Sequence, residues 1–127
     1  MTEGDEFCAA IDRSVLANLR ELQEEGEPDI VAEVGGLFVK HAPEKISAIV
    51  QAVEKGNAKG LQIAAHSLKS SSAYVGAMHL SAMSKELEQM GRSGTMEGVK
   101  DKTEKLRAEY ERVMAALETE IKTADKR

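Results

Sequence analysis

Apolar residues recur three and four positions apart through most of this chain, as in Leu80, Met83, Leu87 and Met90. This spacing places apolar side chains on one face of an α-helix, whereas a half-buried strand would alternate with a period of two. The chain is therefore expected to be all-α. The pattern predicts helices over residues 12–24, 28–56, 58–75 and 80–90, the last of these ended by Gly91 to Gly94, and from 95 onward.

Each predicted helix has one apolar face, which needs a partner to be removed from water. These faces should meet in a common core. The expected core residues are Val15, Leu16, Leu19, Leu22, Ile30, Val34, Leu37, Phe38, Ala42, Ile46, Ile49, Val53, Leu61, Ala64, Ala65, Leu68, Ser72, Val75, Leu80, Met83, Leu87, Met90, Val99, Thr103, Leu106, Tyr110, Val113, Leu117 and Ile121.

Residues that favour turns and caps set the ends of these helices. Asp12 is a candidate N-cap of the first helix, and Pro28 suits the first turn of the second. Gly56 and Gly76 should end the second and third helices, because glycine readily adopts the left-handed conformation of a helix end. Pro43 removes a backbone hydrogen bond inside the second helix, so either a kink or two abutting helices are expected there.

Four long amphipathic segments joined by short glycine-containing links are typical of an antiparallel, up-down-up-down four-helix bundle. The additional N-terminal helix would cover this bundle. The chain is expected to form one domain over residues 1–127, with a core from about 11 to 121 and flexible termini. Pairing of the last helix with a second chain would leave three apolar faces without a partner, so a monomer is expected.

Composition and charge argue against several classes of protein. No apolar run approaches the roughly 20 residues of a membrane-spanning helix, and the acidic start MTEGDEFCAA differs from a secretory signal. The single cysteine, Cys8, cannot form an internal disulfide. With 17 basic against 22 acidic residues and 3% aromatic residues, no basic, base-stacking surface is expected. We therefore expect a cytoplasmic protein that binds neither membranes nor nucleic acid.

The stretch AHSLKSSSAYVGA, residues 65–77, places a histidine and a lysine among small side chains. At 100° per residue, His66 lies about 140° from the apolar direction set by Leu61, so it should face water. Exposed histidines on helices are usually inert, yet a neutral imidazole has one unprotonated ring nitrogen, which is a nucleophile near neutral pH. The residues expected on or beside the same outward face are Lys59, Gln62, Ile63, Lys69, Ser70 and Ala73.

Lys69 lies one turn after His66, where it can offer a cation to phosphoryl oxygens. The other two histidines, His41 and His79, lack the spacing of a zinc site, so no metal ligand is predicted. Nothing in the sequence resembles a glycine-rich nucleotide-binding loop.

The motif HSLK at residues 66–69, followed by SS at 71–72 and GA at 76–77, resembles the signature of histidine-containing phosphotransfer (HPt) domains. In that family the pattern reads His-x-Leu-Lys-Gly-Ser, with Gly-Ala soon after. The similarity continues through Leu80, LE at 87–88 and GR at 91–92, and it covers the chain from Ile11 to about Leu117.

This resemblance implies that His66 accepts a phosphoryl group from an aspartyl phosphate on a response-regulator receiver domain and passes it to another receiver. Lys69 matches the position that steadies the phosphoryl group. Arg92 corresponds to an arginine near the same face, here just past a helix end. Ser70 departs from the family pattern, which has glycine there so that the partner can approach closely. The protein would be a carrier in a two-component phosphorelay and not an enzyme.

The implied partners are response-regulator receiver domains and a hybrid sensor histidine kinase. No cofactor is expected on this chain, because no acidic cluster beside His66 would hold Mg²⁺; the receiver would bring the metal and most catalytic groups. Two alternatives stay open. One is a helical adaptor that binds receivers or kinases without phosphorylation, which only Ser70 supports. The other is the phosphoacceptor fragment of a larger hybrid or chemotaxis-type kinase.

Overall fold

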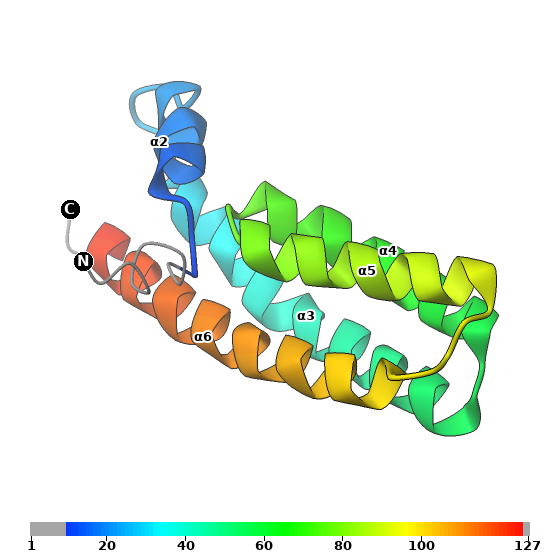
Figure 1. Cartoon of the computed structure of the whole chain (residues 1–127). Coiled ribbons are helices and arrows are strands. Elements are labelled where there is room, and N and C mark those ends of the chain that lie inside the picture. Colours follow the sequence, from blue (N-terminus) through cyan, green and yellow to red (C-terminus); the bar gives the residue numbers. More distant parts are fainter. Residues whose placement is uncertain (1–9, 126–127) are drawn as a thin grey trace, which may run out of the picture.

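Helices make up most of residues 10–125, the part of the chain that this computed structural model describes. Their order is α2 (Arg13–Glu21), α3 (Ile30–Lys55), α4 (Ala58–Tyr74), α5 (Met78–Ser93) and α6 (Val99–Asp125), as Figure 1 shows. No strand occurs among these residues. The predicted all-α class is confirmed.

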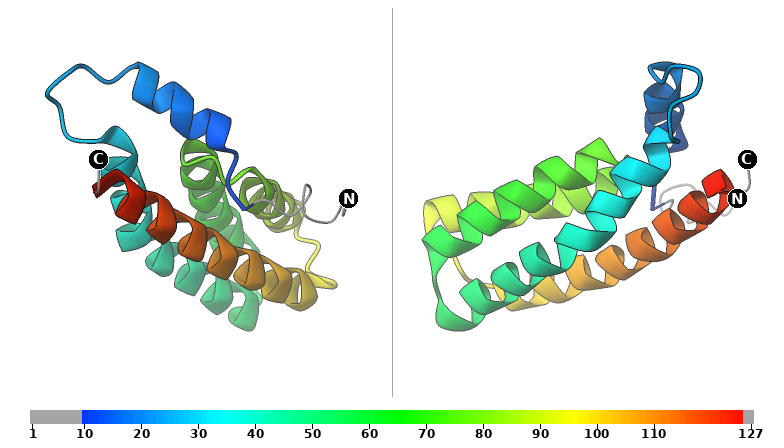
Figure 2. Two further views of the ribbon diagram at one scale, coloured as in Figure 1. Left: turned by 90° about the vertical axis from the view of Figure 1, so that its left-hand side faces the viewer. Right: turned by 180° about the vertical axis from the view of Figure 1, so that it is seen from behind.

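Four of these helices form an antiparallel bundle in which the chain reverses at every link (Figure 1, Figure 2). α3 packs against α4 and α6, and α5 packs against the same two helices, so α4 lies diagonally opposite α6. This is the predicted up-down-up-down arrangement. α2 lies across one end of the bundle, where it packs on α3 as the predicted cover (Figure 1). No helix in the described part is long and apolar enough to cross a membrane.

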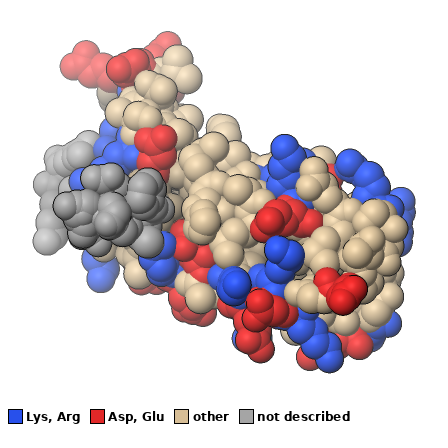
Figure 3. Space-filling view, in the orientation of Figure 1, with Lys and Arg blue, Asp and Glu red and all other residues tan. Residues whose placement is uncertain are grey.

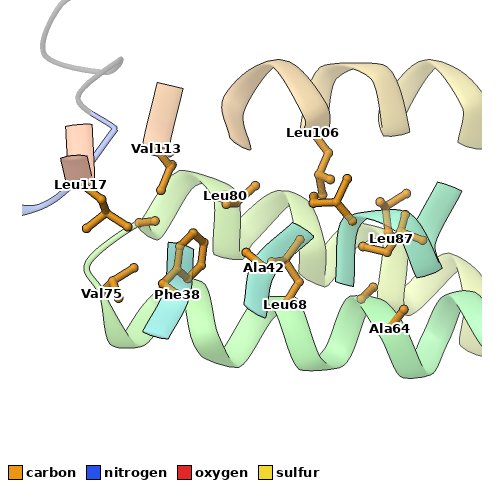
Figure 4. Close-up of a cluster of buried hydrophobic side chains, with 14 of the residues drawn as sticks. Phe38, Ala42, Ala64, Leu68, Val75, Leu80, Leu87, Leu106, Val113 and Leu117 are labelled. Carbon is orange, nitrogen blue, oxygen red and sulfur yellow. The ribbon is translucent and has the colours of Figure 1, made fainter. Parts of the chain in front are cut away.

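The core consists largely of the apolar faces that the sequence predicts (Figure 4). Full burial of an aliphatic side chain contributes about 1.5–3 kcal/mol, which makes this contact the main source of stability. The face of α4 is buried at every predicted position: Leu61, Ala64, Ala65, Leu68, Ser72 and Val75. The residues that meet it from α5 and α6 with at most 1% exposure are Leu80, Leu87, Leu106, Val113 and Leu117.

Two residues expected in the core are instead exposed. Leu22 is 77% exposed because α2 ends at Glu21, so this side chain lies beyond the part of the helix that packs on α3. Leu37 is 58% exposed. The inward face of α3 passes through Phe38, and the adjacent residue points about 100° away from that direction. Met83 and Met90, also expected in the core, are only partly buried against it.

The helix ends follow the expected capping chemistry, but several positions differ. Asp12 caps α2 as predicted, accepting a hydrogen bond from the backbone N–H two residues later at 2.9 Å. α3 begins after Asp29 and not at Pro28, because the Asp29 carboxylate caps the first turn. α6 begins at Val99, four residues later than predicted, after a turn in which Gly98 has a φ of 77°.

α3 runs through Pro43 as one helix and ends at its predicted left-handed cap, Gly56. The alternative of two abutting helices is therefore wrong. Proline lacks the N–H that would bond to the carbonyl of Val39. Pro43 itself lies on the exposed side of α3.

The turn between α4 and α5 is tied to the segment before α2. Gly76 follows the end of α4, as predicted, with a φ of 82°. Its carbonyl accepts a hydrogen bond from the Asp12 N–H at 2.7 Å, and a Cβ on Gly76 would lie 2.8 Å from the Asp12 carbonyl oxygen. Both the left-handed conformation and this close approach favour glycine.

Cys8 and the two chain ends, residues 1–9 and 126–127, lie outside the described residues. The expectations of flexible termini and of a single domain over residues 1–127 stay predictions.

We predict that Gly76→Ala lowers the free energy of unfolding more than Gly94→Ala does. Both changes place a side chain at a positive φ, which alone costs about 1–2 kcal/mol. Nothing lies within 4 Å of a Cβ at Gly94, whereas a Cβ at Gly76 meets the Asp12 carbonyl. Urea denaturation followed by circular dichroism measures both losses. Equal losses would show that the contact with Asp12 does not constrain the turn.

Candidate functional site

The outward face of α4 carries His66 near its middle. α4 begins at Ala58, after the N-cap Asn57, whose side chain accepts a hydrogen bond from the Gly60 N–H at 2.9 Å, and it ends at Tyr74. The opposite face is buried in the core, so the histidine is turned outward, as predicted. Its side chain is 61% exposed. The helix therefore presents the imidazole to solvent from a packed support.

One buried carboxylate, that of Glu88 on α5, lies against this imidazole. Glu88 Oε2 is 2.8 Å from His66 Nδ1 and 3.2 Å from Arg92 Nη2. Glu88 Oε1 is 2.7 Å from Lys69 Nζ. Only 4% of the Glu88 side chain is exposed. These four residues, called the Glu88 cluster below, join α4 to α5 through charge-assisted hydrogen bonds.

Close packing of α4 on α5 brings the Glu88 cluster together. Gly91 lies three residues after Glu88, and a Cβ at this glycine would lie 2.6 Å from the carbonyl oxygen of Ala58 in α4. Toward the other end, Ser81 Oγ donates a hydrogen bond to the Lys69 carbonyl oxygen at 2.9 Å. The two backbones are therefore close on both sides of Glu88, which allows its side chain to reach the imidazole.

The electrostatics of the cluster place a proton on a particular ring nitrogen. The hydrogen bond from Lys69 holds the pKa of Glu88 below its ordinary value of 4.5; burial opposes this effect, and the hydrogen bond with His66 adds to it. The carboxylate is thus ionised at neutral pH and can only accept hydrogen bonds. His66 Nδ1 must then carry the donated proton. In the neutral ring this leaves Nε2 with a free lone pair.

Two predicted residues join the cluster in ways that differ from expectation. Lys69 was expected on the same face as His66, offering a cation to phosphoryl oxygens; it lies there, but bound to Glu88, and its side chain is 29% exposed. Arg92 lies in the last turn of α5 and not past the end of the helix, because α5 continues to Ser93. Both cations therefore neutralise the buried carboxylate.

An open hollow of about 310 Å³ lies beside the imidazole. Gln62 and Ile63 line it together with Lys59. Ser70 and Ala73 lie outside the hollow, further along α4, where Ser70 is exposed and Ala73 partly buried. The outward face of α4 thus combines the hollow on one side of the histidine with small side chains on the other.

Sequence reasoning missed Glu88 as a member of the site. No acidic cluster was expected beside His66, and the structure places one carboxylate there. A sequence signal existed, since Glu88 directly follows Leu87 of the buried face and precedes Arg92 by four residues, the spacing of an ion pair on one helix. That signal predicts the pair within α5, but not its contact with a histidine of another helix.

The other two histidines lie away from the cluster. His41 is exposed on α3, and His79 is exposed in the first turn of α5. Among residues 10–125, no group of three or more His, Cys, Asp or Glu side chains could hold a metal ion. The site is organised around one imidazole and one carboxylate.

Comparison with known proteins shows the family of this chain. The Hpt domain family matches residues 33–116, which include the whole of α4 and α5. This chain belongs to the Hpt domain family. Histidine-containing phosphotransfer protein 4 from Arabidopsis thaliana is 31% identical over 102 residues, which are 79% of this chain and 80% of that protein. The crystal structure of histidine-containing phosphotransfer protein B from Pseudomonas aeruginosa PAO1 matches with a TM-score of 0.80 and 29% identity, over 90% of this chain and 96% of that chain.

Membership of the Hpt family shows what the chain does at the level of its class. It has a histidine phosphotransfer role in two-component signalling. Hpt proteins are phosphoryl carriers, and they interact with response regulators and kinases. The family and the function expected from the HSLK motif are confirmed.

We predict that Glu88→Gln lowers the free energy of unfolding by about 1–3 kcal/mol at neutral pH, because charge-assisted hydrogen bonds are lost. The pKa of Glu88 is lower in the folded chain than its ordinary value of 4.5, so the folded chain binds fewer protons there. This stabilisation is fully present above pH 4.5 and is lost as the pH falls through the folded-state pKa. The difference between the variant and the wild type should therefore shrink in acid.

Urea titrations from neutral to acidic pH measure this difference. Glu86→Gln is the matched control, because Glu86 also lies on α5 but is 60% exposed and 3.7 Å from its partner, Lys102. That variant should change stability little at any pH. A loss for Glu88→Gln that stays the same from neutral to acidic pH would contradict the ionised, ion-paired state of Glu88.

Proposed function

We propose that His66 is the phosphoacceptor, and that it relays a phosphoryl group between aspartates of response-regulator receiver domains. The observation that carries this proposal is the exposed imidazole whose Nδ1 is held by the buried Glu88 carboxylate at 2.8 Å. A nucleophile for a second protein has to be both accessible and correctly protonated. His66 meets both conditions, because its ring is exposed and, in the neutral ring, Nε2 is the nitrogen left without a proton.

The phosphoryl group passes from the aspartate oxygen to His66 Nε2. The Nε2 lone pair attacks the phosphorus of the aspartyl phosphate, an N–P bond forms, and the O–P bond breaks, so the aspartate leaves as a carboxylate. The neutral ring thereby gains a positive charge, which it shares with the Nδ1–H. The Glu88 carboxylate on that proton stabilises this charge as it develops, within a preorganised and largely buried contact. Attack by a second receiver aspartate on the phosphohistidine reverses these steps.

The other members of the cluster have separate parts in this mechanism. Glu88 is a positioning residue, because it acts on the phosphoryl group through the imidazole. Lys69 and Arg92 each donate one N–H to the Glu88 carboxylate. An ammonium has three donors and a guanidinium five, so both retain N–H groups that can donate to phosphoryl oxygens. We assign to them the neutralisation of the transferred group.

The partner supplies the remaining chemistry. Mg²⁺ prefers oxygen ligands, and the carboxylate at this site is already bound by three donor side chains. A receiver therefore brings the Mg²⁺ and the groups that act on the leaving oxygen, and this chain is a carrier that depends on it. Ile63, Ser70 and Ala73 would meet the receiver around His66, with a serine hydroxymethyl group where the family has glycine. A monomer in the cytoplasm suits this role.

The adaptor alternative needs a receiver-binding surface but no Glu88 cluster, so the cluster favours the phosphoacceptor. A receiver domain charged with radiolabelled acetyl phosphate tests the choice. Mixing with this chain should give acid-labile, alkali-stable label on it, as expected for phosphohistidine. His66→Gln should abolish the label, and His79→Gln, an exposed histidine on α5, should keep it. Binding without label across a panel of charged receivers would contradict the proposal and support an adaptor.

We predict that Lys69→Ala slows transfer by about tenfold to a hundredfold, because a cation near the phosphoryl oxygens is lost. Its ammonium is also a donor to the buried Glu88 carboxylate at 2.7 Å, so the free energy of unfolding should fall as well, by about 1–3 kcal/mol. Single-turnover transfer from a charged receiver and urea denaturation measure the two effects. Lys105→Ala on α6 is the control and should transfer normally. Wild-type rates for Lys69→Ala would remove Lys69 from the site.

A further inference from the structure

Cations surround His66 although the chain as a whole carries a net charge of −5. Lys59 lies two turns before His66 on the same face of α4 and lines the same hollow. On α5, Lys85 lies one turn before Glu88 and Arg92 one turn after it. Lys59 and Arg92 line the hollow beside the histidine, Lys69 binds its carboxylate partner, and Lys85 is the fourth cation of α4 and α5.

Acidic residues are scarce on the same two helices. α4 contains no Asp or Glu at all, and α5 contains only Glu86 and Glu88. Glu86 is turned toward α6, where it lies 3.7 Å from Lys102. Figure 3 shows Lys and Arg side chains gathered at the upper right of the molecule, over the far ends of α4 and α5. The two helices that carry the site thus hold more cationic than anionic side chains, on a protein that is negative overall.

The four cations differ in what they are bound to. Lys69 and Arg92 are bound to Glu88 and belong to the mechanism already described. Lys59 and Lys85 are exposed, and neither forms an ion pair with any residue in the described range 10–125. The charge of Glu88 is balanced within the Glu88 cluster, whereas no carboxylate among the described residues balances the charges of Lys59 and Lys85. Together these charges make the local electrostatic potential positive.

We infer that Lys59 and Lys85 form a basic rim that attracts the anionic, phosphorylated face of a receiver to His66. This inference rests on the proposed function. Lys59 lies about 10.5 Å from His66 along the helix axis, comparable with the Debye length of about 8 Å at physiological salt. Its charge therefore acts mainly on the approach of the partner. Charges at the edge of an interface change the association rate and its salt dependence more than they change the later steps.

The test compares two double variants that remove the same number of positive charges. Lys59→Gln with Lys85→Gln neutralises the rim. Lys100→Gln with Lys105→Gln neutralises two exposed lysines of α6, which lies diagonally opposite α4. Phosphotransfer from a charged receiver is measured at limiting and at saturating receiver concentration, from low to high sodium chloride. Circular dichroism checks that both variants remain folded, as expected for exposed lysines.

For the rim variant, the second-order rate constant should fall about tenfold at low salt and approach the wild-type value at high salt. The rate at saturation should change much less. The α6 variant should match the wild type. Wild-type salt dependence in the rim variant, or an equal loss in both variants, would overturn the inference while labelling of His66 still supported the proposed function. Absence of label on the wild type would overturn both.

Discussion

The burial of one carboxylate between α4 and α5 is the constraint on which the site depends. Removing an ionised carboxylate from water is costly unless donors surround it. At Glu88 the donors are the His66 imidazole, the Lys69 ammonium and the Arg92 guanidinium. Two of them come from α4 and one from α5, so the charge can be satisfied only where these helices pack. The same contact that satisfies the carboxylate also orients the ring of the phosphoacceptor that we propose.

The bundle separates stability from chemistry. The inward face of α4 is buried and, apart from Ser72, apolar, so it contributes to the core. The outward face has small side chains around an exposed imidazole, and so it leaves space for a second protein. This arrangement suits a carrier, since the chain need only hold a nucleophile still and in the right protonation state. The catalytic groups can then remain with the partner that arrives and departs.

Local rules were sufficient for most of the fold. The spacing around Leu61 and Leu68 predicts the buried face of α4 and the outward direction of His66, because the helical period fixes both. Asp12 and Gly76 were predictable from capping and left-handed geometry. Leu37 was not, because α3 has a broad apolar surface and only the position of its neighbours decides which part is buried. The Glu88 contact was also beyond reach, since it joins residues 22 positions apart whose pairing depends on the offset between two antiparallel helices.

Gly91 shows how a residue without functional groups can govern reactivity. Its missing side chain sets the thickness of the gap between two helix backbones, with the carbonyl of Ala58 within 2.6 Å of where a methyl group would be. Glu88, three residues before Gly91, holds the proton of the His66 imidazole across this same gap. A larger residue at position 91 would therefore move α5 away from α4 and impair phosphotransfer, although every polar group of the site would still be present. Variants made only at charged residues would not reveal this cause.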